Sequence, residues 1–184
     1  MLQVISVLLE NKPGALLRVT GLLAARGYNI ESLTVARTID PEFSRMTIVV
    51  DVDPNIRAQV IKQMNKLINV IQASEMTDDT AASREMVLLH IRPEHRDRAA
   101  VLKEAEIFSA RVVDSSVEGF AFEVTGGIGE LEEFIGVMQS YGEIEVTRSG
   151  AIAVSTEARK LRLQPPVPTR AALRQEEFDG VSNA

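Results

Sequence analysis

A short polar loop directly after the first apolar run carries the residue types that could bind a small charged molecule. Asn11 and Lys12 are followed by Pro13 and Gly14, a pair typical of a helix start because proline's fixed φ suits the first turn. A helix start presents unsatisfied backbone N–H groups and the positive end of the helix dipole, which favour a carboxylate. Gly14 has no Cβ to obstruct a ligand, and the Asn11 amide can donate and accept hydrogen bonds. The loop is therefore suited to bind a carboxylate, although on their own the same residues more often form a plain strand-to-helix turn.

No other group of residues has the spacing of a catalytic or metal site. The sequence has no cysteine, and His90 and His95 lack a zinc-binding spacing. The glycine-rich run at residues 126–129 misses both nucleotide-binding patterns, and glutamates occupy the positions where a phosphate would lie: Glu130, Glu132 and Glu133. We therefore expect no catalytic residue, no metal and no cofactor in this chain.

Composition and charge exclude several classes of partner. The 184 residues carry a net charge of -6, whereas binding to nucleic-acid phosphates requires clustered Lys and Arg. Aromatic residues make up only 4%, unlike RNA-binding sheets that stack bases on aromatic side chains. No apolar run approaches the roughly 20 residues of a membrane span, and the chain begins with a strand-like run instead of a leader. We expect a cytoplasmic protein that binds neither nucleic acid nor membrane.

The elements that position the loop follow a recognisable order over residues 1–77. Helical apolar spacing follows the loop and recurs after Asp53, and strand-like runs cover residues 2–9, 28–38, 46–52 and 70–75. The expected buried positions are, on the first helix, Leu16, Val19, Leu22 and Leu23 and, on the second, Val60, Ile61, Met64, Leu67 and Ile68. The order βαββαβ predicts a ferredoxin-like domain.

The same order recurs after a polar break at residues 77–83. Helices are expected at residues 97–107 and after the glycine run, and strands at residues 85–91, 110–116, 120–125 and 144–147. The predicted fold class is therefore α+β, with two ferredoxin-like βαββαβ domains at residues 1–77 and 84–160. Residues 161–184 are proline-rich and then polar, so we expect a mobile tail there.

The first strand is apolar on both faces, as the run from Val4 to Leu9 shows. A βαββαβ unit places both helices on one face of its sheet. Something must therefore cover the other face, because a large exposed apolar patch favours aggregation. The second domain, a second copy of the chain or another protein could do so.

Three blocks of residues in the first half resemble a known family. Residues 8–16 (LLENKPGAL), 26–35 (RGYNIESLTV) and 44–48 (SRMTI) closely resemble, in order, the N-terminal ACT domain of acetolactate synthase regulatory subunits. In the second half, residues 106–108 (EIF) and 148–150 (RSG) resemble the C-terminal domain of that family. The resemblance covers roughly residues 1–160 and leaves the proline-rich tail without a counterpart.

The resemblance implies a non-catalytic subunit that activates a catalytic large subunit and confers feedback inhibition by valine, or by leucine or isoleucine. It implies a homodimer through the ACT domains. Thiamine diphosphate, a divalent metal and FAD would belong to the large subunit. The effector site would combine the loop of one copy with two residues of the neighbouring copy: Asn11, Pro13, Gly14, Ala15 and Leu16, with Asn29 and Ile30.

Two interpretations stay open at this stage. Arg45 is a candidate contact with the large subunit, although Arg45 and Arg148 also suit solvated strand ends, and Asn29 could be a turn former after Gly27. A free-standing ACT-type amino-acid sensor that acts on a different target is the alternative function.

Overall fold

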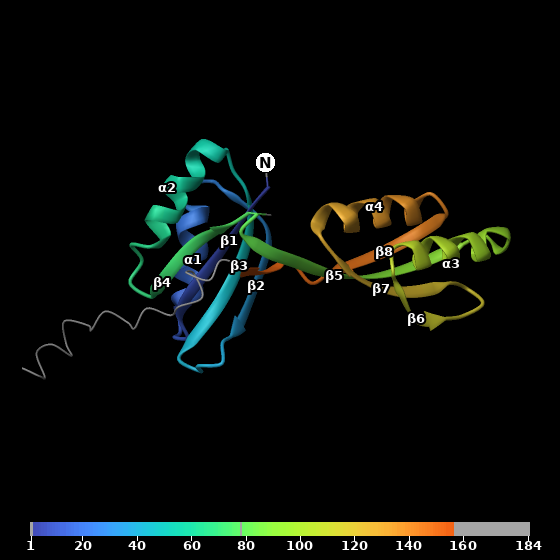
Figure 1. Cartoon of the computed structure of the whole chain (residues 1–184), viewed down its shortest axis with the longest axis horizontal. Coiled ribbons are helices and arrows are strands. Elements are labelled where there is room, and N and C mark those ends of the chain that lie inside the picture. The colour runs from blue at the N-terminus through green and yellow to red at the C-terminus, as the bar shows by residue number, and fades with distance from the viewer. Residues whose placement is uncertain (1, 78, 157–184) are drawn as a thin grey trace, which may run out of the picture.

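The computed structural model describes residues 2–77 and 79–156 of the chain. They form two antiparallel sheets, each covered by two helices on one face, and β5 leads from the first sheet into the second (Figure 1). This arrangement confirms the predicted α+β fold with two ferredoxin-like domains. The mobile tail predicted at residues 161–184 lies outside the described residues.

The first domain has the order βαββαβ. Its sheet runs β2-β3-β1-β4, so that β1 is central and β2 is an edge strand. The bounds are β1 (Leu2–Glu10), α1 (Ala15–Ala24), β2 (Asn29–Arg37), β3 (Phe43–Asp51), α2 (Pro54–Met64) and β4 (Val70–Met76).

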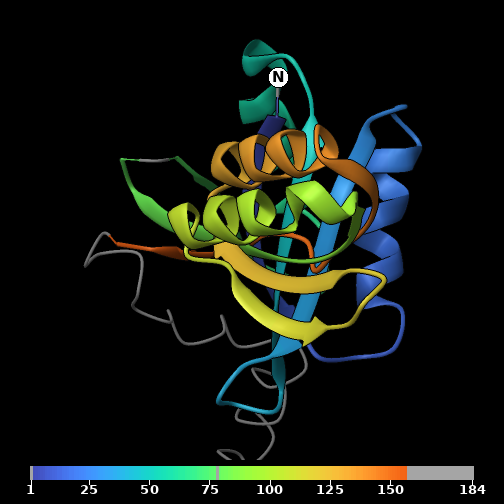
Figure 2. The same ribbon diagram turned by 90° about the vertical axis from the view of Figure 1, so that its right-hand side faces the viewer.

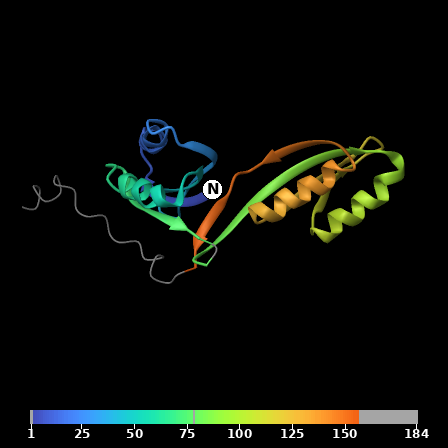
Figure 3. The ribbon, with the colours of Figure 1, turned by 90° about the horizontal axis from the view of Figure 1, so that it is seen from above.

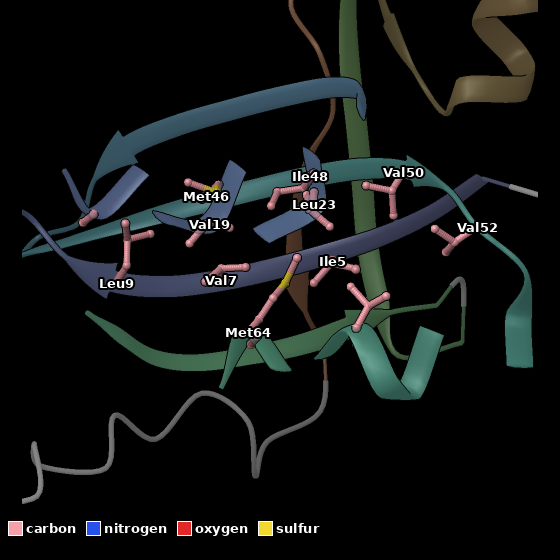
Figure 4. Packing of buried hydrophobic residues seen from close by; sticks show 13 residues of the cluster. Ile5, Val7, Leu9, Val19, Leu23, Met46, Ile48, Val50, Val52 and Met64 are labelled. Carbon is pink, nitrogen blue, oxygen red and sulfur yellow. The ribbon is translucent and has the colours of Figure 1, made fainter. Parts of the chain in front are cut away.

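The first core lies between this sheet and its two helices (Figure 4). Strand alternation turns every second residue of β1 and β3 toward the helices, and α1 and α2 each add residues at helical spacing. Full burial of such side chains contributes about 1.5–3 kcal/mol each. The buried side chains include Ile5, Val7, Leu9, Met46, Ile48, Val50, Val19, Leu23, Val60 and Met64.

Two predicted core positions are wrong. Leu16 is 42% exposed, and Ala15 is buried in its place, because α1 begins only after Gly14 and turns its second residue outward. Ile68 is 81% exposed because α2 ends at Met64, so the helical spacing does not extend that far. The Asn65 side chain stops α2 there by donating to the carbonyl of Ala73 at 3.0 Å and accepting from its N–H at 2.8 Å.

The second domain repeats the topology with the strand order β6-β7-β5-β8. Its helices lie together on one face of the sheet (Figure 2), and the rings of Phe122 and Phe134 are fully buried between them and the sheet. The bounds are β5 (Ala81–Pro93), the 3-10 turn His95–Asp97, α3 (Arg98–Ile107), β6 (Arg111–Ser115), β7 (Phe120–Gly126), α4 (Ile128–Gln139) and β8 (Gly142–Arg148).

A further strand, β9 (Ile152–Ser155), was not expected from the sequence. It pairs with residues 81–84 at the start of β5, so the polar break predicted at residues 77–83 is shorter than expected. Seen from above (Figure 3), β5 and the chain after β8 both run between the two domains.

The segment that contains β9 contacts β1 and β4 of the first sheet. Ala151, Ala153 and Ser155 are buried, whereas Ile152 and Val154 between them are more than half exposed. The helices of the first domain leave one face of its sheet open, and the second domain covers part of that face. This is the first of the three alternatives expected from the sequence. None of the helices within residues 2–77 and 79–156 has the length and apolar content of a membrane span.

Candidate functional site

The predicted loop leads into the start of α1 with an unusual backbone. Gly14 immediately precedes the helix with φ of 82°, in the left-handed region that favours glycine. A Cβ placed on Gly14 would meet no atom within 4 Å, so the space beside it is open. Among residues 2–77 and 79–156 no side chain caps this helix, and the N–H of Ala15 donates to the carbonyl of Lys12 at 3.2 Å, which leaves the N–H groups of Leu16 and Leu17 to a ligand or solvent. Leu16 is exposed beside them and offers an apolar surface.

Hydrogen bonds from Asn11 hold the loop against the β2–β3 connection. Its backbone N–H donates to the carbonyl of Glu42 at 2.7 Å, and its side-chain Nδ2 donates to the carbonyl of Pro41 at 3.0 Å. The Asn11 side-chain amide, which is predicted to bind a ligand, therefore already donates a hydrogen bond within the protein. Arg45, the predicted partner contact, is exposed on β3 and donates to Ser6 Oγ at 3.1 Å.

A small polar network joins the end of β1 to α1 beneath the loop. Asn69 Nδ2 donates to Glu10 Oε2 at 2.7 Å, and Arg18 of α1 donates to Asn69 Oδ1 at 2.7 Å. The hydrogen bond from Asn69, and next the ammonium of Lys12 at 3.2 Å, lower the pKa of Glu10 against the opposing effect of burial. The carboxylate form of Glu10 is thus the one that supports the loop.

Asn69→Ala is expected to raise the pKa of Glu10 back toward its ordinary value. A folded pKa below the unfolded one adds stability at pH values above the unfolded pKa, and that stability is lost as pH falls through the folded pKa. The variant should therefore lose part of its stability at neutral pH and show a flatter decline on acidification. NMR titration of Glu10 measures the shift, and Lys12→Gln is the control, with a smaller rise because Asn69 has the larger influence.

Asn29 and Ile30 do not lie near the loop within one chain. Asn29 pairs with Asp51 at one end of the sheet, and Asp51 pairs with Leu2, whereas the loop follows Glu10 at the other end. The eight residue steps of β1 between these ends span roughly 26 Å. Asn29 is exposed at the start of edge strand β2, where its amide donates to the Glu31 carboxylate. A single chain therefore brings residues 11–16 together but separates them from Asn29 and Ile30.

A second polar cluster, in the second domain at its side toward the first, is not predicted by the sequence. Glu85 is only 4% exposed and accepts from Arg148 through Nε at 3.1 Å and Nη2 at 2.7 Å. Arg148 also donates to Glu132 of α4. The Glu85 carboxylate, more than any other group, raises the pKa of Arg148. Arg148 lies at the end of β8 and is exposed, as the strand-end interpretation has it, but its guanidinium is paired with two carboxylates that only the fold brings close.

This cluster borders a cavity between the two domains. The cavity has a volume of about 470 Å³ and is lined by residues of both sheets and of α4, among them Leu2, Leu33, Val49, Ile128, Glu132 and Arg148. The domains thus leave an open space beside this cluster. The sequence signal that could have pointed here is the family block at residues 148–150.

The strand order of the first domain and its glycine-started helix fit an ACT domain, and the family match over residues 5–72 defines the chain as an ACT-domain protein. The family description "AHAS small subunit-like ACT domain" matches residues 5–72, and "Small subunit of acetolactate synthase" matches residues 84–157. The chain therefore belongs to the acetolactate synthase small-subunit family.

Several proteins are similar to the chain over most of its length. An acetolactate synthase small subunit of Mycolicibacterium smegmatis is 43% identical over 84% of this chain and 91% of the relative. The isozyme 3 small subunit of Escherichia coli is 39% identical over 88% of this chain and 100% of the relative. The crystal structure of the Thermotoga maritima acetolactate synthase small subunit superimposes with a TM-score of 0.74 at 33% identity, covering 85% of this chain and 98% of that one.

Proposed function

We propose that this chain is a regulatory subunit that activates the catalytic large subunit of acetolactate synthase and makes it sensitive to a branched-chain amino acid. Valine is the favoured effector, with leucine and isoleucine as the alternatives. The names of the relatives, which are small subunits of this enzyme, support a large-subunit partner. The chain itself contributes binding and no chemistry.

The start of α1 is the observation that carries this proposal. The N–H groups of Leu16 and Leu17, which no side chain caps, and the positive end of the helix dipole would bind the carboxylate of the amino acid. The exposed side chain of Leu16 offers an apolar surface beside that position for a branched side chain. Pro13 and Ala15 would shape the loop on either side of Gly14. The positive φ of Gly14 supports this placement because it keeps the approach open.

Pairing of two copies through β2 would complete the site. The two-fold axis of a homodimer makes the paired edge strands antiparallel, which reverses the direction of the partner's β2. Asn29 and Ile30 of one copy would then lie at the end of the sheet where the other copy carries residues 11–16. The edge position of β2 supports this arrangement, since its outer hydrogen-bonding groups are available to a second strand.

The chemistry of acetolactate formation would belong to the large subunit with its thiamine diphosphate, divalent metal and FAD. Within residues 2–77 and 79–156 no group of three acidic or histidine side chains could hold a metal ion. The family resemblance, rather than this observation, is the reason for placing thiamine diphosphate, the divalent metal and FAD on the partner.

Reconstitution tests this function directly. The large subunit is assayed for acetolactate formation alone, with this chain, and with this chain plus valine, leucine or isoleucine. We expect activation by the chain and inhibition by one or more of the amino acids, with no turnover by the chain alone. Turnover by the chain alone, or no effect on the large subunit, would refute the proposal. Purification of the chain with an unrelated target would favour a free-standing sensor.

A further inference from the structure

The contact between the two domains passes through a tight turn after β8, residues 148–150. Ser149 pairs with Met86 of β5 through two hydrogen bonds, from Ser149 N–H to the Met86 carbonyl at 2.9 Å and from Met86 N–H to Ser149 Oγ at 3.0 Å. The N–H of Gly150 donates to the Glu85 carboxylate at 3.2 Å. The turn is therefore fixed to β5 where β5 passes from β9 to β7 and β8.

The other side of this turn rests on β2 of the first domain. Thr34 Oγ1 donates to the carbonyl of Ala151 at 2.7 Å, and the N–H of Ala151 approaches Ser32 Oγ at 3.4 Å. Gly150 has φ of 78°, and a Cβ on it would lie 3.0 Å from Cγ2 of Thr34. Both the backbone conformation and the close approach thus require glycine.

The same strand carries the proposed effector contacts a few residues earlier. Asn29 and Ile30 begin β2, a register shift between Ile30 and Ser32 follows, and Ser32 and Thr34 then contact the turn. Ser32 and Thr34 share the face of β2 opposite the core, because Leu33 between them packs into the core. A displacement at the start of β2 would therefore act directly on the turn.

Beyond the turn, the cluster continues into α4. Arg148 connects buried Glu85 to Glu132 on α4, so the turn and that helix are joined through one guanidinium group. The cavity of about 470 Å³ beside the cluster leaves room for the domains to change their separation. The contacts then form a continuous path from β2 through the turn to α4.

We propose that the turn at residues 148–150, anchored by Glu85 and resting on Ser32 and Thr34, transmits the effector-bound state of β2 to the second domain. Glu85, Arg148 and Thr34 are positioning residues in this path, since none of them belongs to the proposed effector site. This inference rests on the proposed regulatory function and names the internal connection that the function needs. Effector binding and inhibition should therefore be separable by substitutions at this turn.

Thr34→Val tests the connection with a small change of shape. Valine keeps the β-branched packing against Gly150 and removes only the hydroxyl donor, so the domain should fold as before. In the reconstituted enzyme, we expect inhibition at saturating valine to fall by at least about half, while calorimetric Kd for valine changes less than about twofold, because only the coupling is lost. Thr38→Val is the matched control, since Thr38 donates to the Asp40 carbonyl at 2.8 Å within the first domain.

Glu85→Gln breaks the same path from its other side. It should likewise reduce inhibition while leaving valine binding nearly unchanged. The enzyme with the double variant Thr34→Val and Glu85→Gln should retain as much valine inhibition as the enzyme with the more affected single variant, because both substitutions break the same connection. If valine inhibits both single variants as fully as the wild type, the inference about the turn is refuted, but the inhibition of the wild type still supports the regulatory function. A wild-type complex that does not respond to valine would instead refute the function and the inference with it.

Discussion

Replacing Gly14 with aspartate is expected to leave activation of the large subunit intact and to abolish feedback inhibition. The new carboxylate would lie at the helix start where the effector's carboxylate binds, and two unit charges about 4 Å apart near a protein surface repel by about 4 kcal/mol. Even a fraction of this repulsion would raise the valine concentration for half-inhibition by at least about tenfold. Inhibition curves of the reconstituted enzyme measure the change.

Gly14→Asn is the matched control for the charge. Asparagine and aspartate have nearly the same shape, and both tolerate a positive φ better than other residues do, so the strain at φ of 82° is shared. We expect Gly14→Asn to retain much more inhibition than Gly14→Asp. Equal inhibition by valine in Gly14→Asp and the wild type would place the effector elsewhere.

Coexpression of the Gly14→Asp and Asn29→Ala variants is expected to restore valine inhibition that neither variant shows alone. Gly14→Asp removes the loop half of the site and Asn29→Ala the strand half, and these halves lie at opposite ends of one sheet. A mixed dimer then holds one doubly altered site and one intact site. Random pairing makes about half of the dimers mixed, so about half of the wild-type inhibition should return if one site suffices.

The control for this experiment pairs Gly14→Asp with a chain that carries both substitutions. No dimer from that pair contains an intact site, because every copy has the altered loop, so inhibition should stay absent. If the first pair also stays insensitive, the loop and Asn29 do not complete one site across two copies. The side-chain bond of Asn29 to Glu31 would then be the more important role of that residue.

Most of the fold could be predicted because its elements have strong local signals. The apolar runs of β1 and β3, and the Pro13–Gly14 pair that lies just before α1, are signals carried by residues close together in the chain. The same locality explains the two wrong core positions. Helical spacing identifies which residues share a face but not where a helix ends, so the spacing extends the predicted buried face to Ile68 although α2 stops at Met64.

The short strand β9 was missed for the opposite reason. Four residues are too few to show a clear strand periodicity in the sequence. Small buried residues alternate with larger exposed ones in β9, and this alternation is explained only by the packing of β9 on the first sheet. The same holds for Arg148, whose partner Glu85 is 63 residues away in the chain. Contacts between distant residues depend on the packing of whole domains, which no local pattern encodes.

The sequence by itself determined the two βαββαβ units, the family and the loop at residues 11–16, because each rests on residues that are neighbours along the chain. Only the tertiary structure decided that Asn29 lies at the far end of the sheet from that loop, and that Glu85, Arg148 and Thr34 meet at one turn. Strand register and domain packing set these distances, and both arise from the folding of the chain as a whole.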